Sequence, residues 1–150
     1  TGPARGALGV SRLPRIGITC YPSQGGSGIV ATELGLNLAR SGYSVHFICA
    51  SMPLRLRQYR ENVFYHEVEV ADYPVFQYPP YTLSLATAMS ETATRCGLDF
   101  LHVHYAIPHA ASAFLAREMV GKTLDTAPPP RAIGTIWSMV SSRAGMRRWQ

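Results

Sequence analysis

Long apolar runs and charged residues are both scarce in this sequence. No uninterrupted apolar run reaches the roughly 18 to 20 residues that a membrane-spanning helix needs. Only 15% of the residues are charged while 47% are hydrophobic, a composition too apolar for a disordered chain. The sequence therefore predicts a folded domain without a membrane span, and its 150 residues are enough for one domain with a buried core.

Cysteine is scarce as well. The three cysteines, Cys20, Cys49 and Cys96, are an odd number at wide spacing, which makes a poor disulfide framework and a poor metal site. This usage favours the reducing cytoplasm. Residues 1–14 lack the apolar core of a signal peptide, so we expect them to form a flexible leader.

Cations are in excess, but not in the part of the chain that is predicted to fold. The whole sequence has a net charge of +5, whereas residues 15–121 hold seven arginines and eight acidic residues, a net charge of −1. The surplus lies towards the two ends of the sequence. Because phosphate binding needs cations gathered on one face, we expect no nucleic-acid partner.

Short apolar runs alternate with helical patterns along the first 121 residues. Strands are predicted at residues 15–20, 45–49, 62–70 and 100–104, the third at an edge because its outer positions are acidic. The order of strands and helices predicts an α/β fold with a doubly wound parallel sheet.

Three helices are predicted between and after these strands. In the first, Val30, Leu34 and Leu38 recur at four-residue spacing. The second begins at Thr82 as N-cap and ends at Gly97, and its predicted inward residues are Leu85, Met89, Ala93 and Cys96. The third begins near Pro108, and its apolar positions include Ala111, Leu115 and Met119.

The character of the sequence changes after Gly121. Residues 122–150 include three consecutive prolines and show no sustained period of 2 or 3.6 residues. Residues 132–137 are compatible with one more strand. We therefore predict one domain at 15–121 and leave 122–150 unassigned.

A glycine-rich segment, Gly25, Gly26, Ser27 and Gly28, stands between the first strand and the first helix. Glycine allows the backbone to approach a ligand, and the unpaired N–H groups of a helix start attract a phosphate or a carboxylate. The segment predicts an anion site. A tight turn that only lets the helix pack on the strand is the structural alternative.

His104 and Tyr105 follow the last predicted strand, at the carboxyl edge of the sheet where ligands bind in open α/β folds. We expect them to face the glycine-rich segment and to complete a substrate site. His102, His104 and His109 have spacing that can bind zinc, but no nearby cysteine or acid completes four ligands, so we expect no metal. No nucleophile stands beside a base, and Glu33 is expected to be solvated, so no catalytic residue is assigned.

The glycines also fit the dinucleotide fingerprint as Gly26-x-Gly28-x-x-Ala31. That interpretation needs an acid after the second strand, and none is there. Arg55 or Arg57 could instead hold a 2′-phosphate, so an NADP-binding oxidoreductase domain stays an alternative. A non-catalytic module that binds small anions is a third.

Four segments of the sequence resemble a known family. They are residues 16–35 from Ile16 to Gly35, residues 66–70 (His-Glu-Val-Glu-Val), residues 78–81 (Tyr-Pro-Pro-Tyr) and residues 102–110 from His102 to Ala110. Together they resemble the N-terminal domain of the family 4 glycosyltransferases that begin bacillithiol synthesis. The resemblance covers about residues 15–120.

The resemblance implies a GT-B enzyme with two Rossmann-like domains that transfers N-acetylglucosamine from UDP-N-acetylglucosamine to L-malate with retention of configuration. It implies no metal and no cofactor. The N-terminal domain holds the acceptor, with Gly26 and Ser27 near the donor phosphate or the malate carboxylate and Tyr105 on malate. The leaving phosphate takes the acceptor proton, and a homodimer of the full-length protein is the implied assembly.

The sequence departs from this family after Val120. The expected strand and His-Gly-Thr-Asp segment do not follow, and neither does the second domain, which binds UDP. We therefore expect a truncated chain without turnover of its own, with residues 122–150 either out of frame or divergent.

Overall fold

The structure is a computed structural model, and it describes residues 12–22, 26–70, 74–75, 80–122 and 134–138. Most of the predicted leader, residues 1–11, and most of residues 123–150 lie outside these ranges. No helix within them is long and apolar enough to cross a membrane.

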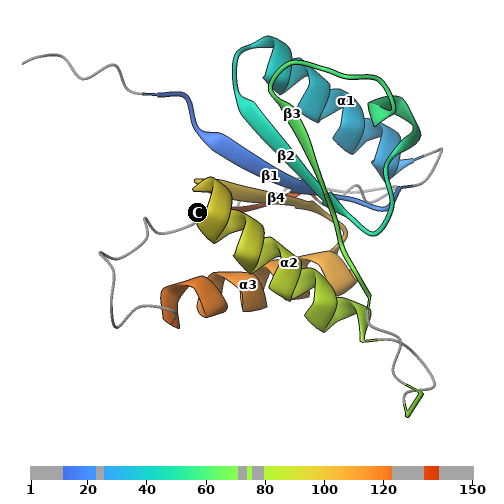
Figure 1. Ribbon diagram of the computed structural model, residues 1–150, viewed down its shortest axis with the longest axis vertical. Coiled ribbons are helices and arrows are strands. Elements are labelled where there is room, and N and C mark those ends of the chain that lie inside the picture. The colour runs from blue at the N-terminus through green and yellow to red at the C-terminus, as the bar shows by residue number, and fades with distance from the viewer. Residues whose placement is uncertain (1–11, 23–25, 71–73, 76–79, 123–133, 139–150) are drawn as a thin grey trace, which may run out of the picture.

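The described residues form a five-stranded parallel sheet with helices on both faces (Figure 1). The strands are β1 (Arg15–Thr19), β2 (Ser44–Cys49), β3 (Val63–Glu67), β4 (Phe100–His104) and β5 (Gly134–Ser138). The helices are α1 (Ser27–Arg40), α2 (Tyr81–Cys96) and α3 (Ala111–Lys122), with short helical turns η1 (Leu54–Leu56) and η2 (Ala106–Ala110). The predicted doubly wound α/β class is confirmed.

The strand order is β3-β2-β1-β4-β5. The chain adds β2 and β3 on one side of β1, then crosses back and adds β4 and β5 on the other side. Ile16 of β1 aligns with Val45 of β2 on one side and with Phe100 of β4 on the other. The order therefore reverses between β1 and β4. In open α/β sheets such a reversal leaves a space beyond the carboxyl ends of the two strands, where ligands bind.

The two outer strands match the predictions in place but not in length. β3 lies at an edge as predicted, but it ends at Glu67 instead of Val70. β5 covers most of the strand predicted at residues 132–137 and pairs with β4 through Gly134 opposite Phe100. The sheet thus continues beyond Gly121, where the sequence pattern changes.

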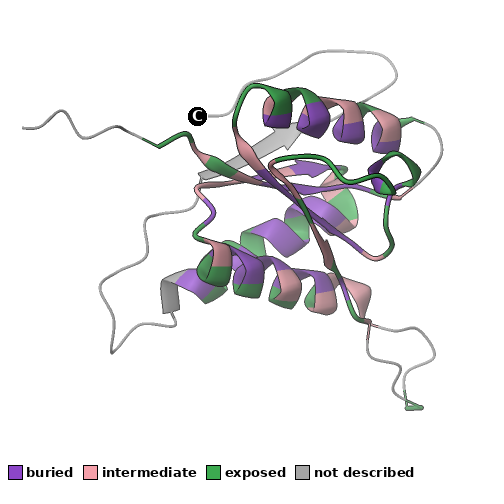
Figure 2. Cartoon of the chain, turned by 45° about the horizontal axis from the view of Figure 1, so that its top comes forward, coloured by how far each residue is buried: buried purple, intermediate pink, exposed green. Residues whose placement is uncertain are grey.

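Helix α1 covers one face of the sheet and lies very close to it. A Cβ added to Gly35 would lie 2.9 Å from Cε2 of Phe47 and 3.1 Å from Cδ1 of Ile18, closer than side-chain carbons normally approach. The buried side of the helix is made largely of small residues, and Figure 2 shows this side turned towards the sheet. Val30, predicted from its spacing to belong with Leu34 and Leu38 on one apolar side, is 48% exposed. That prediction was wrong because small residues, not large ones, make the contact.

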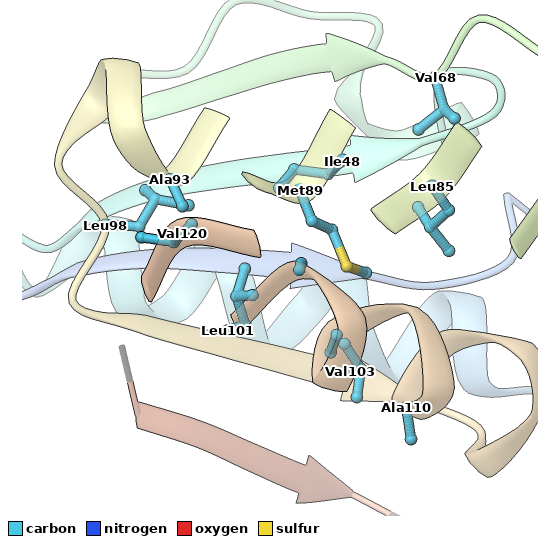
Figure 3. Packing of buried hydrophobic residues seen from close by; sticks show 12 residues of the cluster. Ile48, Val68, Leu85, Met89, Ala93, Leu98, Leu101, Val103, Ala110 and Val120 are labelled. Carbon is cyan, nitrogen blue, oxygen red and sulfur yellow. The ribbon is translucent and has the colours of Figure 1, made fainter. Parts of the chain in front are cut away.

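Helices α2 and α3 cover the other face, α2 with larger side chains and α3 with mostly small ones. Met89 and Leu85 of α2 pack with Leu101 and Val103 of β4 in one buried cluster (Figure 3). On α3 the buried residues are Ser112, Ala113, Ala116 and Val120, whereas Leu115 and Met119 are exposed, so the apolar positions predicted for this helix are not its buried ones.

Only the C-terminal end of α2 agrees with the prediction from the sequence. Gly97 adopts a left-handed conformation (φ 62°) as the C-cap, as predicted, because glycine takes this conformation without steric cost. The N-cap is Pro80 and not Thr82, which lies inside the first turn.

Candidate functional site

The glycine-rich segment and Tyr105 both leave the sheet at its carboxyl edge, on the neighbouring strands β1 and β4 between which the strand order reverses. Tyr21 follows β1 and begins the connection to α1, while Tyr105 follows β4 directly. The topology therefore brings together two segments that are about eighty residues apart in the sequence.

The start of α1 has no side-chain cap. Gly26 is the N-cap residue, is exposed and has a positive φ of 60°, and its carbonyl accepts the first helical hydrogen bond from the N–H of Val30 at 3.3 Å. The first turn contains no acidic residue. The N–H groups of Ser27, Gly28 and Ile29 lie before that bond and have no acceptor within the helix, so this end attracts an anion. Gly25 lies outside the described residues.

A cluster of aromatic rings joins the ends of β1 and β4. The rings of Tyr21 and Tyr105 meet edge to face with centroids 5.2 Å apart, and Tyr21 also contacts the ring of His109 at 4.5 Å. Tyr105 is 46% exposed and Tyr21 is 38% exposed. This exposure leaves the ring and hydroxyl of Tyr105 open to a ligand. The rings of Tyr21 and His109 contact the Tyr105 ring and hold it in position.

The backbone at Tyr105 is strained. Its φ is 81°, a left-handed conformation that a non-glycine residue adopts at a cost of about 1 to 3 kcal/mol. The carbonyl of Tyr105 accepts a hydrogen bond from the N–H of Ala110 at 3.2 Å, which closes the turn η2 behind it. Such conformations persist where the surroundings impose them, and they cluster at binding sites.

His109 links this turn to the start of α2. Its Nδ1 lies within hydrogen-bond distance of the carbonyl oxygen of His104, and a carbonyl only accepts, so Nδ1 carries the hydrogen. Nε2 is then free to accept a hydrogen bond from the hydroxyl of Tyr81 at 3.4 Å. Burial lowers the pKa of His109 and raises the pKa of Tyr81 to about 12, so both groups stay neutral at physiological pH.

Sequence reasoning did not assign Tyr21, Tyr81 or His109 to this site. Tyr81 belongs to the Tyr-Pro-Pro-Tyr segment, and Tyr21 and His109 belong to two of the other segments that carry the family resemblance. Membership of those segments was the signal that could have identified all three.

His104, the other predicted site residue, is buried rather than open to solvent. Only 1% of it is exposed, its Nε2 lies 3.2 Å from Nε2 of His102, and its Nδ1 has no hydrogen-bond partner in the described part of the chain. Because Leu101 and Val103 point to the α2 and α3 side, His104 points to the side that α1 covers. Burial lowers its pKa to about 4, so the ring is neutral.

Two residues considered for other roles form an ion pair. A guanidinium nitrogen of Arg55 contacts a carboxylate oxygen of Glu33 on α1, and Glu33 remains partly exposed to solvent, as sequence reasoning expected. Arg55 is thereby neutralised by a residue of this chain, which disfavours its predicted alternative role of holding the 2′-phosphate of NADP. Arg57 is exposed.

Cys20 and Cys49 lie beside the same edge, far apart in the sequence but neighbours in the fold. Their sulfur atoms are 3.9 Å apart and both residues are fully buried. A hydrogen bond to Cys49, together with burial, raises the pKa of the Cys20 thiol. Spacing along the chain concealed this pair because the register of β1 on β2 places the two residues side by side.

A parallel sheet whose order reverses beside an uncapped, glycine-led helix start defines a Rossmann-like α/β domain. The chain belongs to Glycosyltransferase Family 4, whose family model matches residues 24–145. That match extends well beyond Gly121 into the residues that sequence analysis left unassigned.

One curated relative gives a finer comparison. Over 110 residues the chain is 57% identical to N-acetyl-alpha-D-glucosaminyl L-malate synthase of Bacillus anthracis, an alignment that covers 73% of this chain and 29% of the relative. The chain therefore spans less than a third of the length of that enzyme.

Proposed function

We propose that this chain is the acceptor-binding part of a retaining glycosyltransferase that transfers N-acetylglucosamine from UDP-N-acetylglucosamine to the hydroxyl of L-malate. The observation that carries the proposal is the 57% identity to an N-acetyl-alpha-D-glucosaminyl L-malate synthase. The geometry of the carboxyl edge supports it, because that edge offers groups that suit a small dicarboxylate.

Malate has two carboxylates and one hydroxyl, so its site needs hydrogen-bond donors and positive potential. The uncapped start of α1 offers the amides of Ser27 and Gly28, with the positive end of the helix dipole behind them. The hydroxyl of Tyr105 is a second donor, on a ring fixed by Tyr21 and His109. We propose that these two groups of donors bind different parts of malate.

In the reaction that we propose, this chain contributes by positioning the acceptor. The acceptor hydroxyl attacks the anomeric carbon of the sugar, the bond to the UDP phosphate breaks, and the leaving phosphate takes the hydroxyl proton. The residues of this chain hold the acceptor hydroxyl on the face of the sugar from which the phosphate leaves, as retention requires, and this positioning lowers the entropic part of the barrier. His104 contributes by supporting the strand end from which Tyr105 emerges.

Binding of L-malate to the 150-residue chain tests the proposal. A hydrogen bond to a charged group contributes about 1.5 to 3 kcal/mol, so Tyr105→Phe should weaken malate binding by roughly tenfold or more. Tyr43→Phe is the matched control, because Tyr43 precedes β2 at the opposite edge of the sheet. Isothermal titration calorimetry measures both. Equal weakening by the two variants would count against the assignment of Tyr105.

A second variant tests the glycine-rich segment separately. A Cβ at Gly26 meets no atom within 4 Å, so Gly26→Ala introduces no clash but strains the positive φ. We expect weaker malate binding with an unchanged circular dichroism spectrum. Unaltered affinity in this variant would leave the helix start without a role in acceptor binding.

Measurements of turnover and of cofactor binding distinguish the glycosyltransferase proposal from the oxidoreductase and anion-binding alternatives. Because the resemblance assigns UDP binding to a second domain, we expect no UDP release when the 150-residue chain is mixed with UDP-N-acetylglucosamine and malate. Release of UDP would refute this expectation. Micromolar binding of NADPH that is lost in Arg55→Ala would favour the oxidoreductase alternative, and malate binding without reaction in a complete protein would favour the anion-binding module.

A further inference from the structure

A group of three potential metal ligands lies away from the carboxyl edge. Nδ1 or Nε2 of His46, the same atoms of His66, and Sγ of Cys96 offer one ligand atom each, all within 4.8 Å of one another. It is the one such group of three or more histidine, cysteine or acidic residues in the part of the chain that the structure describes. The three residues come from β2, β3 and the last position of α2.

The fold brings these side chains together on the face that α2 and α3 cover. Val45 and Phe47 belong to the cluster beneath α1, so His46 between them points to the opposite face. His46 aligns with Phe64 in the register of β2 on β3, and His66 lies two residues further on the same side of β3. His46 is 6% exposed and stacks on the ring of Phe64 at 4.7 Å.

The third residue is held in place by its backbone. Cys96 ends α2, directly before the left-handed Gly97, and its carbonyl oxygen accepts a hydrogen bond from the guanidinium of Arg15 at 2.9 Å. Because α2 begins beside His109 at the carboxyl edge and ends next to the start of β1, its last residue lies at the amino edge. The cluster is therefore separate from the glycine-rich segment.

The chemistry of the three donors suits zinc. Two imidazole nitrogens and a thiolate are the ligands that Zn²⁺ takes in tetrahedral sites, and a water can supply the fourth because His66 and Cys96 are partly exposed. Bond lengths of about 2.0 Å to nitrogen and 2.3 Å to sulfur place tetrahedral ligand atoms about 3.3 to 3.6 Å apart. Nδ1 of His46 and Nε2 of His66 are now 2.9 Å apart, so they need only a few tenths of an ångström more.

The protonation states also agree with metal binding. Burial lowers the pKa of His46 to about 4 and lowers the pKa of His66, so both rings are neutral and have a lone pair to donate. Two guanidiniums act on the site, Arg15 on His46 and Arg95 on His66. They oppose a bare divalent cation, but a thiolate ligand from Cys96 reduces the charge of the bound ion to +1.

We propose that His46, His66 and Cys96 bind one Zn²⁺ ion, which ties the end of α2 to the edge strand β3. Binding replaces the hydrogen bond between the two rings with two metal–nitrogen bonds, and the Cys96 thiol releases its proton to solvent as the metal–sulfur bond forms. The site is structural. It takes no part in the proposed glycosyl transfer, and it lies apart from the residues that would perform that reaction.

Cobalt is the probe that tests the site, because Co²⁺ replaces zinc and reports on its ligands by absorption. We expect the 150-residue chain to take up one equivalent of Co²⁺ with a thiolate-to-cobalt band in the near ultraviolet, which excess Zn²⁺ removes. Cys96→Ser should abolish the band. His66→Gln removes a direct ligand and should weaken binding more than the roughly 10- to 100-fold loss seen when only a hydrogen-bond partner of a ligand is removed.

The chain offers a matched control in its second histidine pair. His102 and His104 have nitrogen atoms 3.2 Å apart, but no third ligand joins them within the described residues. His102→Gln should leave the cobalt band and the affinity unchanged. Circular dichroism confirms that each variant is folded, and His66→Gln provides the test if Cys96→Ser fails to fold.

Three outcomes would overturn the proposal. They are the absence of a thiolate band in the native chain, a band that persists in Cys96→Ser and therefore comes from Cys20 or Cys49, and equal loss of affinity in His66→Gln and His102→Gln. The structural role has its own measurement. Zn²⁺ should raise the unfolding temperature of the native chain and not that of His66→Gln, and binding without such a rise would contradict that role.

Discussion

The two faces of the sheet are packed by different means. Beneath α1 the helix backbone comes close to the sheet because Gly35 has no side chain, whereas α2 on the other face packs through larger residues such as Met89 and Leu85. This close contact between the helix backbone and the side chains of Phe47 and Ile18 leaves little freedom in the position of the helix. The contact beneath α1 therefore fixes where the start of this helix lies.

Each face also contains a pair of histidines in contact. His46 and His66 meet at 2.9 Å on the face of α2 and α3, and His102 and His104 meet at 3.2 Å on the face of α1. Only the first pair has a cysteine beside it among the described residues. Two histidines in contact can therefore bind a metal only where the covering helix supplies a third ligand, as α2 does with Cys96.

The largest expected effect concerns the face that α2 and α3 cover. Met89 is fully buried at the centre of its cluster, so Met89→Ala should lower the free energy of unfolding by about 2 to 5 kcal/mol through lost burial and a cavity. Leu115→Ala on the exposed side of α3 should cost only about 0.5 kcal/mol. Urea denaturation measures both, and similar losses would mean that α3 packs through its large residues after all.

The next effect tests the face that α1 covers. Gly35→Ala should destabilise the fold and Gly35→Val should do so further, by about 1 to 3 kcal/mol, because the added atoms overlap Phe47 and Ile18. Helix propensity alone predicts the opposite sign for alanine, a gain of about 1 kcal/mol. A stabilised Gly35→Ala variant would show that α1 is not in close contact with the sheet.

A smaller effect depends on pH. Burial lowers the pKa of His104 from 6.5 to about 4, so between these values the unfolded chain binds the proton more readily than the folded one. The free energy of unfolding should therefore fall as the pH is lowered from 6.5 towards 4, by at most about 1.4 kcal/mol per pH unit for this group. His104→Gln should show a shallower fall than the native chain. Identical slopes would mean that His104 is protonated as easily when folded as when unfolded.

The smallest effect is expected on the outer side of α1. Glu33 and Arg55 are partly exposed, and an ion pair of this kind contributes about 0.2 to 1 kcal/mol. A double-mutant cycle with Glu33→Gln and Arg55→Gln should give a coupling in that range that shrinks as salt is added. Coupling that does not change with salt would contradict a solvent-exposed pair.

The strands could be predicted from the sequence because short apolar runs and glycine-rich connections are local signals. The buried sides of the helices could not. Val30 and Leu115 have the spacing of an inward-facing residue, yet the contacts are made by small residues, whose importance depends on how close the sheet comes. A pattern of large apolar residues contains no information about that distance.

The candidate site at the carboxyl edge was also predictable only in part. The positions of the glycine-rich segment and Tyr105 follow from topology, since both stand after neighbouring strands. The contacts of Tyr21 and Tyr81 with His109 could not be predicted, because each joins segments that only the folded chain brings together. The same holds for Cys20 with Cys49, whose proximity results from strand register.

The differing burial of the three cysteines has a practical consequence for labelling. A bulky maleimide should alkylate Cys96 in the native protein and leave the two fully buried thiols untouched. A fluorophore could thus be attached at a single point, without engineering, at the edge of the sheet opposite the glycine-rich segment. Bound zinc would protect that point, so the rate of labelling would itself report whether metal is present.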